Sequence, residues 1–537
     1  MSQVDIRSPA LTSAAQAWVD KLVAEQVASA LAHQDPTLWG PRAQPEAARR
    51  LAWVTLPQTS RPLPATIEAL RAELHSDGID RVVLAGMGGS SLAPEVICAT
   101  AAQEQGSSAL TVLDTTDPGQ VADALAGDLG RTVLVVSSKS GSTVETDSHR
   151  RVFAAAFAAA GLDPAAHLVV VTDPGSPLQR VAEADGYRAV ITADPNVGGR
   201  YSALSAFGLV PAGLAGADIT SLLDDAARQA PLLAVDDPAN PALRLAAALA
   251  AGHAAGAEKV VLADTGSGIV GFADWAEQLI AESTGKDGTG LLPVVVDNPA
   301  APGFADAGAD ATPVAIGPGG ATAAVAVTGT LGEQMLLWEH AIAVVGRLLG
   351  INPFDQPDVE AAKVAARSQL KDASGPPPAF VDGDVEVHPV GDWLPAGVAT
   401  LRDALGALVA ATPRRGYLAV QAYLDRVADA SAAVLRTELA RRTRLQTTFG
   451  WGPRFLHSTG QYHKGGHQNG AFLQLTGALE KDIPVPGSGF TLGELQRAQA
   501  LGDADVLAAR GRPVLRLHLL DRAAGLVALV RALREPQ

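Results

Sequence analysis

The chain has 537 residues, which is too long for one hydrophobic core, so we expect two or more domains. Hydrophobic residues make up 47% of it and the formal net charge is −16, and so acidic a surface argues against DNA or RNA as a partner. A single cysteine, Cys98, excludes an internal disulfide, and no run of about 20 apolar residues predicts a membrane span. Residues 1–10 lack the apolar stretch of a signal peptide, and we expect a cytoplasmic location.

The first part of the chain carries apolar side chains at helical spacing. Residues 11–35 predict one amphipathic helical stretch, and residues 63–76 predict another. We therefore interpret residues 1–64 as a helical N-terminal extension.

An alternation of apolar runs and helical patterns follows. Residues 81–85, 133–136 and 167–172 are short runs rich in β-branched side chains, separated by helical stretches. Strands that are apolar on both faces are typical of a parallel sheet covered by helices on either side. The pattern predicts a three-layer αβα domain over residues 65–235.

The same rhythm begins again in the second half. Residues 259–263, 291–296 and 324–328 predict three more strands, and a second domain of the same fold over residues 236–372. A proline-rich linker at 374–379 leads into a C-terminal section, residues 373–537. There we expect a helix at 417–427 and a late strand at 513–519.

Two loops that follow predicted strands have the composition of anion sites. In a parallel sheet such loops lie at the ligand-binding edge, where backbone N–H groups point outward. The first is Gly-Met-Gly-Gly-Ser-Ser at 86–91, a weak signal because a tight turn needs the same glycines.

The second loop, Ser-Lys-Ser-Gly-Ser-Thr at 138–143, is more specific. A helix cap needs one hydroxyl, and this loop offers several around a lysine, which suits a phosphate dianion. It lacks the spacing of a nucleotide-binding P-loop. The sequence thus predicts a site for a phosphate-bearing small molecule.

These motifs resemble the sugar-isomerase domain, and further segments narrow the resemblance to the glucose-6-phosphate isomerase family. They are Gly-Gly-Arg-Tyr-Ser at 198–202, Glu-Ser-Thr-Gly-Lys at 282–286, a Leu-Gly-Glu-Gln helix pattern at 331–340, and Asn-Pro-Phe-Asp-Gln at 352–356 with the helix that follows. They occur in the family's order between about residues 80 and 370. The resemblance implies two sugar-isomerase domains and reversible conversion of glucose 6-phosphate into fructose 6-phosphate through an enediolate.

The family's site residues carry over position by position. By resemblance, Glu282 is the base that moves the proton, Arg200 stabilises the enediolate, and Lys363 acts with Gln356 at the sugar hydroxyls. Taken alone, each would fit an ordinary surface charge or helix cap. The resemblance also implies that the substrate is held by Gly89, Ser90, Ser138, Lys139, Ser140, Ser142, Thr143 and Gly199.

The family's ring-opening histidine is missing from its usual place, because no histidine lies between Glu282 and residue 331. A similar segment occurs far downstream at 454–464, followed by a family-like stretch at 490–501. This order resembles a rearranged family member. His463 matches best if one residue is inserted, and His457 is the alternative.

Other readings stay open beside the isomerase. A non-catalytic phosphosugar-binding regulator would need the phosphate loop but not the catalytic set, and an isomerase that also accepts mannose 6-phosphate would look the same. A ketose amidotransferase would need an N-terminal nucleophilic cysteine, and Cys98 is not so placed. We expect no metal, no cofactor and no membrane partner, and the family implies a homodimer with shared sites.

Overall fold

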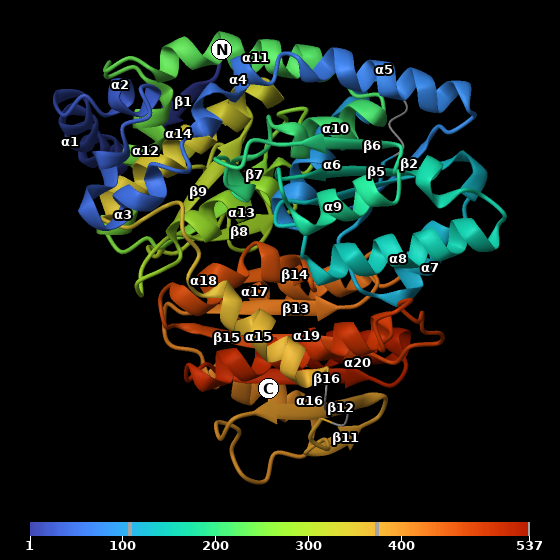
Figure 1. Cartoon of the computed structure of the whole chain (residues 1–537). Coiled ribbons are helices and arrows are strands. Elements are labelled where there is room, and N and C mark those ends of the chain that lie inside the picture. Colours follow the sequence, from blue (N-terminus) through green and yellow to red (C-terminus); the bar gives the residue numbers. More distant parts are fainter. Residues whose placement is uncertain (106–109, 371–374, 535–537) are drawn as a thin grey trace.

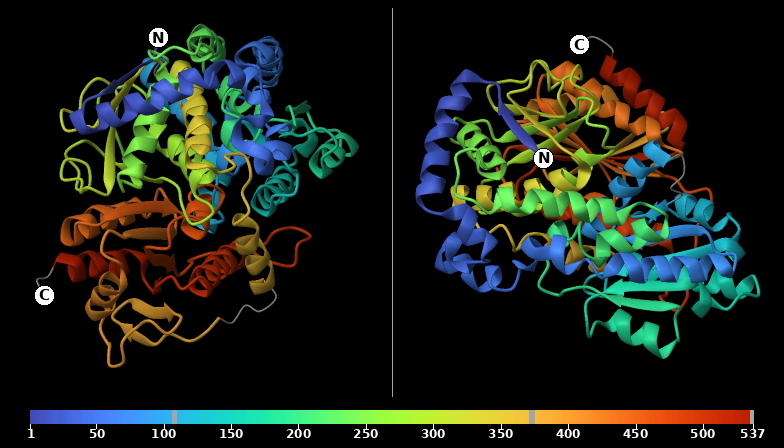
Figure 2. Two further views of the ribbon diagram at one scale, coloured as in Figure 1. Left: turned by 90° about the vertical axis from the view of Figure 1, so that its left-hand side faces the viewer. Right: turned by 90° about the horizontal axis from the view of Figure 1, so that it is seen from above.

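The computed structural model describes residues 1–105, 110–370 and 375–534, and it contains three separate β-sheets. The first two sheets and their helices lie together at one end of the molecule, and the C-terminal section lies below them in Figure 1. The left view of Figure 2 shows the same division from the side. Among the described residues, no helix is long and apolar enough to cross a membrane.

The first sheet is parallel throughout, in the order β3-β2-β4-β5-β6. Its strands are β2 (Arg81–Gly86), β3 (Leu110–Leu113), β4 (Thr132–Ser138), β5 (Leu168–Thr172) and β6 (Ala189–Thr192). Val82 and Leu84 pack into one core and Val83 and Ala85 into another, because successive side chains point to opposite faces. The predicted three-layer domain and its predicted strands are confirmed.

Helices cover both faces of this sheet. The face that bears Val82 packs on α6 (Leu92–Gln105) and α10 (Ala206–Leu214). The face that bears Val83 packs on α7 (Pro118–Leu125), α8 (Val144–Ala159) and α9 (Pro177–Ala184). Short 3-10 turns connect the layers, namely η3 (Gly88–Ser90), η4 (Leu129–Arg131), η5 (Pro164–His167) and η6 (Gly199–Tyr201).

The second sheet has the order β1-β10-β9-β7-β8. The strands β7 (Lys259–Asp264), β8 (Leu292–Val296), β9 (Ala311–Ile316) and β10 (Val325–Thr328) are parallel; β7, β8 and β10 were predicted, and β9 was not. One face packs on α12 (Pro241–Ala254), α13 (Phe272–Thr284) and α14 (Leu331–Leu349), and α11 (Ile219–Leu233) packs against α14. The other face shares a core with side chains of the C-terminal section, so that section supplies the outer layer that helices supply in the first domain.

The N-terminal extension is helical except at its start. It holds α1 (Pro9–Ala24), α2 (Val27–Ala32), η1 (Pro36–Trp39), α3 (Gly40–Ala47), η2 (Ala52–Thr55), α4 (Leu56–Thr59) and α5 (Leu63–Ser76). Residues Gln3–Ile6 form β1, which pairs antiparallel with β10 at the edge of the second sheet. The all-helical expectation is wrong for these residues, because four residues are too few to show a period and the sheet edge offers free backbone partners.

The C-terminal section contains a mixed sheet in the order β11-β12-β16-β15-β13-β14. Its strands are β11 (Phe380–Asp382), β12 (Val385–Val390), β13 (Tyr417–Tyr423), β14 (Gln446–Trp451), β15 (Gly470–Gly477) and β16 (Val514–Leu519). One face packs on α16 (Leu401–Ala411), α17 (Val434–Thr443) and α20 (Arg522–Arg534). The other face of the sheet packs on α19 (Leu492–Ala509) and on the short α18 (Gly460–Gly465), and α15 (Val359–Gln369) packs on α19. Two 3-10 turns, η7 (Ala430–Ala433) and η8 (Arg454–His457), complete the section.

The late strand at 513–519 is confirmed as β16, but the helix expected at 417–427 is wrong. Residues 417–423 form β13, a central strand with every side chain buried. A short apolar run fits a helical pattern and a buried strand equally well, and only the tertiary context decides between them. The predicted linker begins at Ser374, which lies outside the described residues. The predicted domain boundaries stay a proposal.

Candidate active site

A cavity of about 480 Å³ lies at the carboxyl ends of the first sheet's strands, where their loops meet the last turns of α13 and the η8 segment. This is the edge at which ligands bind in open parallel sheets. Most of the site residues predicted from the sequence line it: Gly89, Ser90, Ser138, Lys139, Ser140, Thr143, Gly199, Arg200, Glu282, Gln356 and His457. The structure therefore gathers residues that are up to 368 positions apart in the chain, from Gly89 to His457.

The loop between β4 and α8 presents hydroxyl groups to this cavity. Ser138 Oγ lies 3.0 Å from Thr143 Oγ1, and Ser137 Oγ is buried without a partner among the described residues. Thr143 stands at the N-cap of α8 but makes no capping bond with its side chain. Its hydroxyl and the helix N-terminus are therefore available to an anion.

Lys139 lines the cavity, and its ammonium group forms an ion pair with Asp173. Its Nζ lies 2.6 Å from Asp173 Oδ2 and donates to the backbone oxygen of Pro195 at 3.1 Å. Burial lowers the pKa of the Lys139 ammonium and raises the pKa of the Asp173 carboxyl. Lys139 therefore holds the loop to its neighbours as well as facing a ligand.

Two arginines that the sequence motifs do not connect with the site also line the cavity. Arg49 and Arg50 follow α3 in the N-terminal extension. Arg50 is fixed by Glu46, 2.7 Å from its Nε, and by the backbone oxygen of Pro195 at 3.0 Å. The adjacent pair of basic residues was a visible signal, but nothing in the sequence placed it beside the phosphate loop. It supplies local positive charge on an acidic protein.

The glycines after β2 allow two loops to touch. A Cβ atom on Gly89 would lie 2.0 Å from the backbone oxygen of Gly199, and one on Gly88 would lie 2.6 Å from that of His457. Gly88 also has a φ of +55°, in the left-handed region that favours glycine. The Gly-Gly turn is thus required by close packing around the cavity, in addition to any contact with a ligand.

Arg200 and Glu282 form a buried pair at the base of the cavity. Arg200 Nε lies 3.3 Å from Glu282 Oε2, and both side chains are less than a tenth exposed. Arg200 Nη2 donates to the backbone oxygens of Phe354 and Asp355 at 3.2 and 3.1 Å, and lies 3.5 Å from Gln356 Oε1. Its Nη1 has no partner among the described residues, so one donor of this fixed guanidinium is unused.

Burial sets the protonation behaviour of Glu282. It raises the pKa of the carboxyl, while the charge of Arg200 and a hydrogen bond from Gln278 oppose the rise. A carboxylate whose pKa is shifted toward neutrality can accept and return a proton near physiological pH.

Gln278, one turn earlier on α13, positions two of these groups. Its Nε2 donates to the backbone oxygen of His457 at 2.9 Å and to Glu282 Oε1 at 3.3 Å. The sequence gives no sign of this residue's importance, because its role depends on a contact with a segment 179 positions away.

His457 faces the cavity from the C-terminal section. Its Nε2 lies 3.0 Å from Oε1 of Glu145, a buried residue in the first turn of α8. The same Oε1 accepts from Gln499 Nε2 at 2.6 Å. The histidine is thus held by a carboxylate that is itself held, an arrangement that fixes the ring of an acid–base group.

His463, the better match from sequence, does not line the cavity. It is buried in the core between Tyr417 and Phe472, and its Nδ1 lies 3.1 Å from the Tyr417 hydroxyl. Burial and the nearby cations Lys464 and Arg512 lower its pKa well below the usual value. Alignment with one inserted residue could not show that α18 turns this side chain away.

Two other predicted residues, Ser142 and Lys363, differ from the rest of the predicted set. Ser142 is exposed, does not line the cavity, and lies 3.0 Å from Ser140 through their Oγ atoms. Lys363 belongs to α15, but its side chain lies outside the described part of the structure. Within the described residues, no three His, Cys, Asp or Glu side chains are arranged to hold a metal ion.

Known sequences match parts of this chain. The family model described as phosphoglucose isomerase matches residues 71–301. A glucose-6-phosphate isomerase of Thermosynechococcus vestitus is 32% identical over 373 residues, which cover 57% of this chain and 70% of that protein. One from Synechococcus sp. is 38% identical over 206 residues, or 37% of this chain, and one from Acaryochloris marina is 36% identical over 234, or 41%. The chain spans only 39% and 44% of the length of these last two relatives.

Solved structures show the same fold. A hypothetical protein from Thermus thermophilus has a TM-score of 0.57 and 26% identity, and the match covers 70% of this chain and 100% of that one. A glucose-6-phosphate isomerase from Chlamydia trachomatis has a TM-score of 0.50 and 22% identity, with 63% of this chain and 75% of that one covered.

Proposed function

The chain belongs to the phosphoglucose isomerase family, and on this premise we propose that it interconverts glucose 6-phosphate and fructose 6-phosphate. The observation that carries the proposal is the buried pair of Glu282 and Arg200, with one unpartnered guanidinium nitrogen, in the cavity that also holds the phosphate loop. A base beside a fixed cation is what enediolate chemistry needs.

The proton transfer is assigned to Glu282. In the open-chain aldose, its carboxylate takes the proton from C2, the electron pair forms the C1–C2 double bond, and negative charge develops on the carbonyl oxygen. Return of the proton to C1, with transfer of the hydroxyl proton from O2 to O1, gives the ketose. Arg200 supplies a permanent positive charge for the enediolate oxygens, because its guanidinium does not lose its proton.

Binding and ring opening fall to the surrounding residues. The hydroxyls of Ser138 and Thr143 and the N-terminus of α8 hold the phosphate, with Arg49 and Arg50 nearby. His457, held by Glu145, moves the proton that opens the ring. Gln356 is assigned to the sugar hydroxyls, and Lys363 keeps the role that the family resemblance gives it.

The test is turnover of fructose 6-phosphate in deuterium oxide, with glucose 6-phosphate followed by a coupled assay and deuterium at C2 followed by NMR. Isomerisation through an enediolate incorporates solvent deuterium, whereas an internal hydride shift does not. Absence of turnover, with phosphosugar binding retained, would instead support the regulator. Mannose 6-phosphate in the same assay tests the dual-specificity alternative.

A homodimer and a cytoplasmic location stay predictions. In the single chain, His457 lines the same cavity as Glu282 and is held by Glu145 of its own chain, so no histidine from a second chain is required to complete the site. We therefore expect specific activity that does not fall when the protein is diluted below the concentration at which sedimentation shows monomers.

A further inference from the structure

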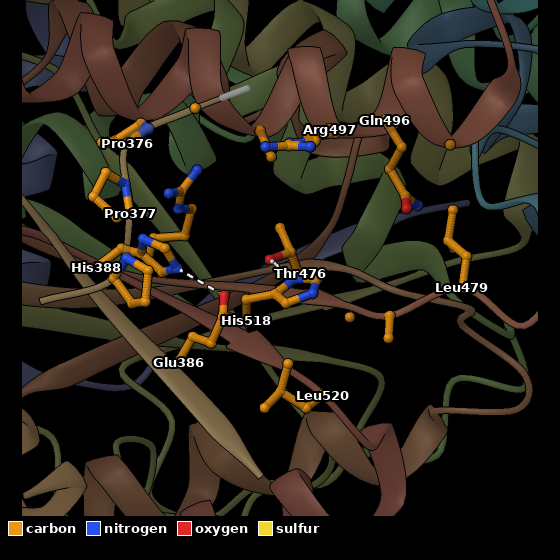
Figure 3. A pocket seen from close by; sticks show the side chains of 17 residues that line it. Pro376, Pro377, Glu386, His388, Thr476, Leu479, Gln496, Arg497, His518 and Leu520 are labelled. Atoms are coloured by element: carbon orange, nitrogen blue, oxygen red, sulfur yellow. Dashed lines mark hydrogen bonds and ion pairs between the residues drawn. The ribbon is translucent and has the colours of Figure 1, made fainter. Parts of the chain in front are cut away.

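A second cavity, of about 590 Å³, lies in the C-terminal section. It lies between α19 and the face of the third sheet formed by β12, β15 and β16, and Figure 3 shows the prolines at 376 and 377 on one side of it. None of the residues that line it lines the sugar-phosphate cavity. The proposed isomerase reaction gives it no role.

Two guanidinium groups face this cavity. Arg516 stands on β16 and is 7% exposed, and its Nε has no hydrogen-bond partner. Arg497, on α19, is exposed at the opposite side. Within the described residues, neither arginine has a carboxylate at ion-pair distance, although Asp505 and Glu386 lie close enough to act on the charge of Arg516.

The carboxylate and the imidazoles beside the two arginines have partners of their own. His388 is 7% exposed with its Nδ1 unpartnered, and its Nε2 lies 3.2 Å from Glu386, which is thereby engaged. His518 Nδ1 lies 2.9 Å from Thr476 Oγ1. Leu479, Leu520 and the prolines supply apolar lining around the cavity, and Gln496 adds a side-chain amide.

We propose that this cavity binds a second small molecule by a phosphate monoester group, separately from the sugar-phosphate substrate. Two guanidinium groups reach the space from different elements, and their N–H donors approach it from two sides, which suits a tetrahedral dianion with several acceptor oxygens. The prolines and leucines would contact the uncharged remainder of the molecule. The volume is within the range of metabolite sites.

Helix α19 lines the second cavity and supports a side chain behind the first. Gln496, Arg497 and Ala500 line the second cavity, while Gln499 on the same helix holds Glu145, the partner of His457. Ligand binding at the two cavities can be measured in the same protein, and substitutions of residues that line only one cavity distinguish the two sites.

Equilibrium dialysis of the full chain with radiolabelled inorganic phosphate tests the proposal. We expect two phosphates per chain in the wild type. Arg516→Gln and Arg497→Gln should each raise Kd at one site by about tenfold or more, the effect of losing a charge-assisted hydrogen bond. Acetate at equal concentration should not displace this phosphate.

The controls separate this site from the first. Arg531→Gln removes the same charge from an exposed position on α20, and should leave both phosphates bound. Both cavity variants should keep wild-type kcat and KM with fructose 6-phosphate. A stoichiometry of one, or unchanged two-site binding in the Arg497 and Arg516 variants, overturns the proposal, and so does displacement by acetate. Arg497 is exposed, so its variant decides the matter if Arg516→Gln fails to fold. The measurement does not depend on isomerase activity.

Discussion

Two strand–loop–helix units reach the sugar-phosphate cavity by opposite ends. The unit β4–loop–α8 presents its loop, so that hydroxyls and a helix N-terminus face the cavity. The unit β7–turn–α13 also has a Gly/Ser-rich turn after an apolar strand, at residues 264–268. It contributes nothing to the cavity there, and supplies Gln278 and Glu282 from the last turns of its helix.

The difference lies in how each turn uses its polar groups. In the second unit, Asp264 accepts hydrogen bonds from the backbone N–H and the hydroxyl of Ser267, and Thr265 Oγ1 donates to the backbone oxygen of Ile316 at 3.1 Å. A carboxylate thus occupies the donors that an anion would use. A Gly/Ser turn after a parallel strand is therefore a ligand site only when its donors are left free.

The largest effect that we expect is on kcat, and it tests whether the β7–turn–α13 unit acts through the end of α13. Glu282→Gln removes the proposed base while keeping its shape, and we expect kcat to fall by about 10³-fold. Asp264→Asn, in the turn of the same unit, should leave kcat unchanged. A Glu282→Gln enzyme with wild-type turnover would remove the base assignment. Both are measured by the coupled assay.

The segment after β14 extends the comparison to a third strand–turn–helix unit, because its turn carries His457 and its helix carries His463. His457→Gln is expected to lower the rate by about 10²-fold, as it removes an acid–base group. His463→Gln should lower the melting temperature and leave kcat nearly unchanged, since it disturbs a buried contact with Tyr417. The reverse pattern would restore the sequence-based choice of His463.

The phosphate loop should affect binding more than turnover. We expect the double variant Ser138→Ala, Thr143→Val to raise KM for fructose 6-phosphate by about tenfold with little change in kcat, because a phosphate contact is made in both ground and transition states. Ser267→Ala, the matching hydroxyl in the other unit, should change neither value. Equal effects in both turns would contradict the distinction between them.

The smallest effect that we expect is on the pH dependence of kcat/KM, through the pKa of Glu282 near the end of α13. Lys286 lies just beyond α13, and its positive charge lowers the pKa of Glu282 against the larger effect of burial. Lys286→Met should raise that pKa further. Since Glu282 must be ionised to accept a proton, the acid limb of kcat/KM would move to higher pH, by less than about 1 unit. A shift to lower pH would be inconsistent with this arrangement.

Much of the fold could be predicted from local pattern. The apolar runs that became β2, β4, β5 and β7 are recognisable because buried parallel strands are apolar on both faces. The run at 417–423 was not, because a short apolar stretch has no period that separates strand from helix.

The residues of the cavity that belong to the family's motifs could be predicted from the sequence. The residues that reach it only through tertiary packing could not. Glu145 and His457 are 312 positions apart, so their contact has no local signature. Arg50 and Gln278 are ordinary residues until the chain places them beside the cavity. The match to His463 did not show that this side chain lies outside the cavity, because matching by sequence does not say which face of α18 is buried.

The strand order of the third sheet has a consequence for how the protein is made. β16 lies between β12 and β15, so the sheet that carries His457 cannot close until residues near 519 have left the ribosome. The phosphate loop, Arg200 and Glu282 emerge much earlier. The first two sheets of a nascent chain can thus form long before the segment that bears His457 is held in place, because β16 is made after every other strand of the third sheet.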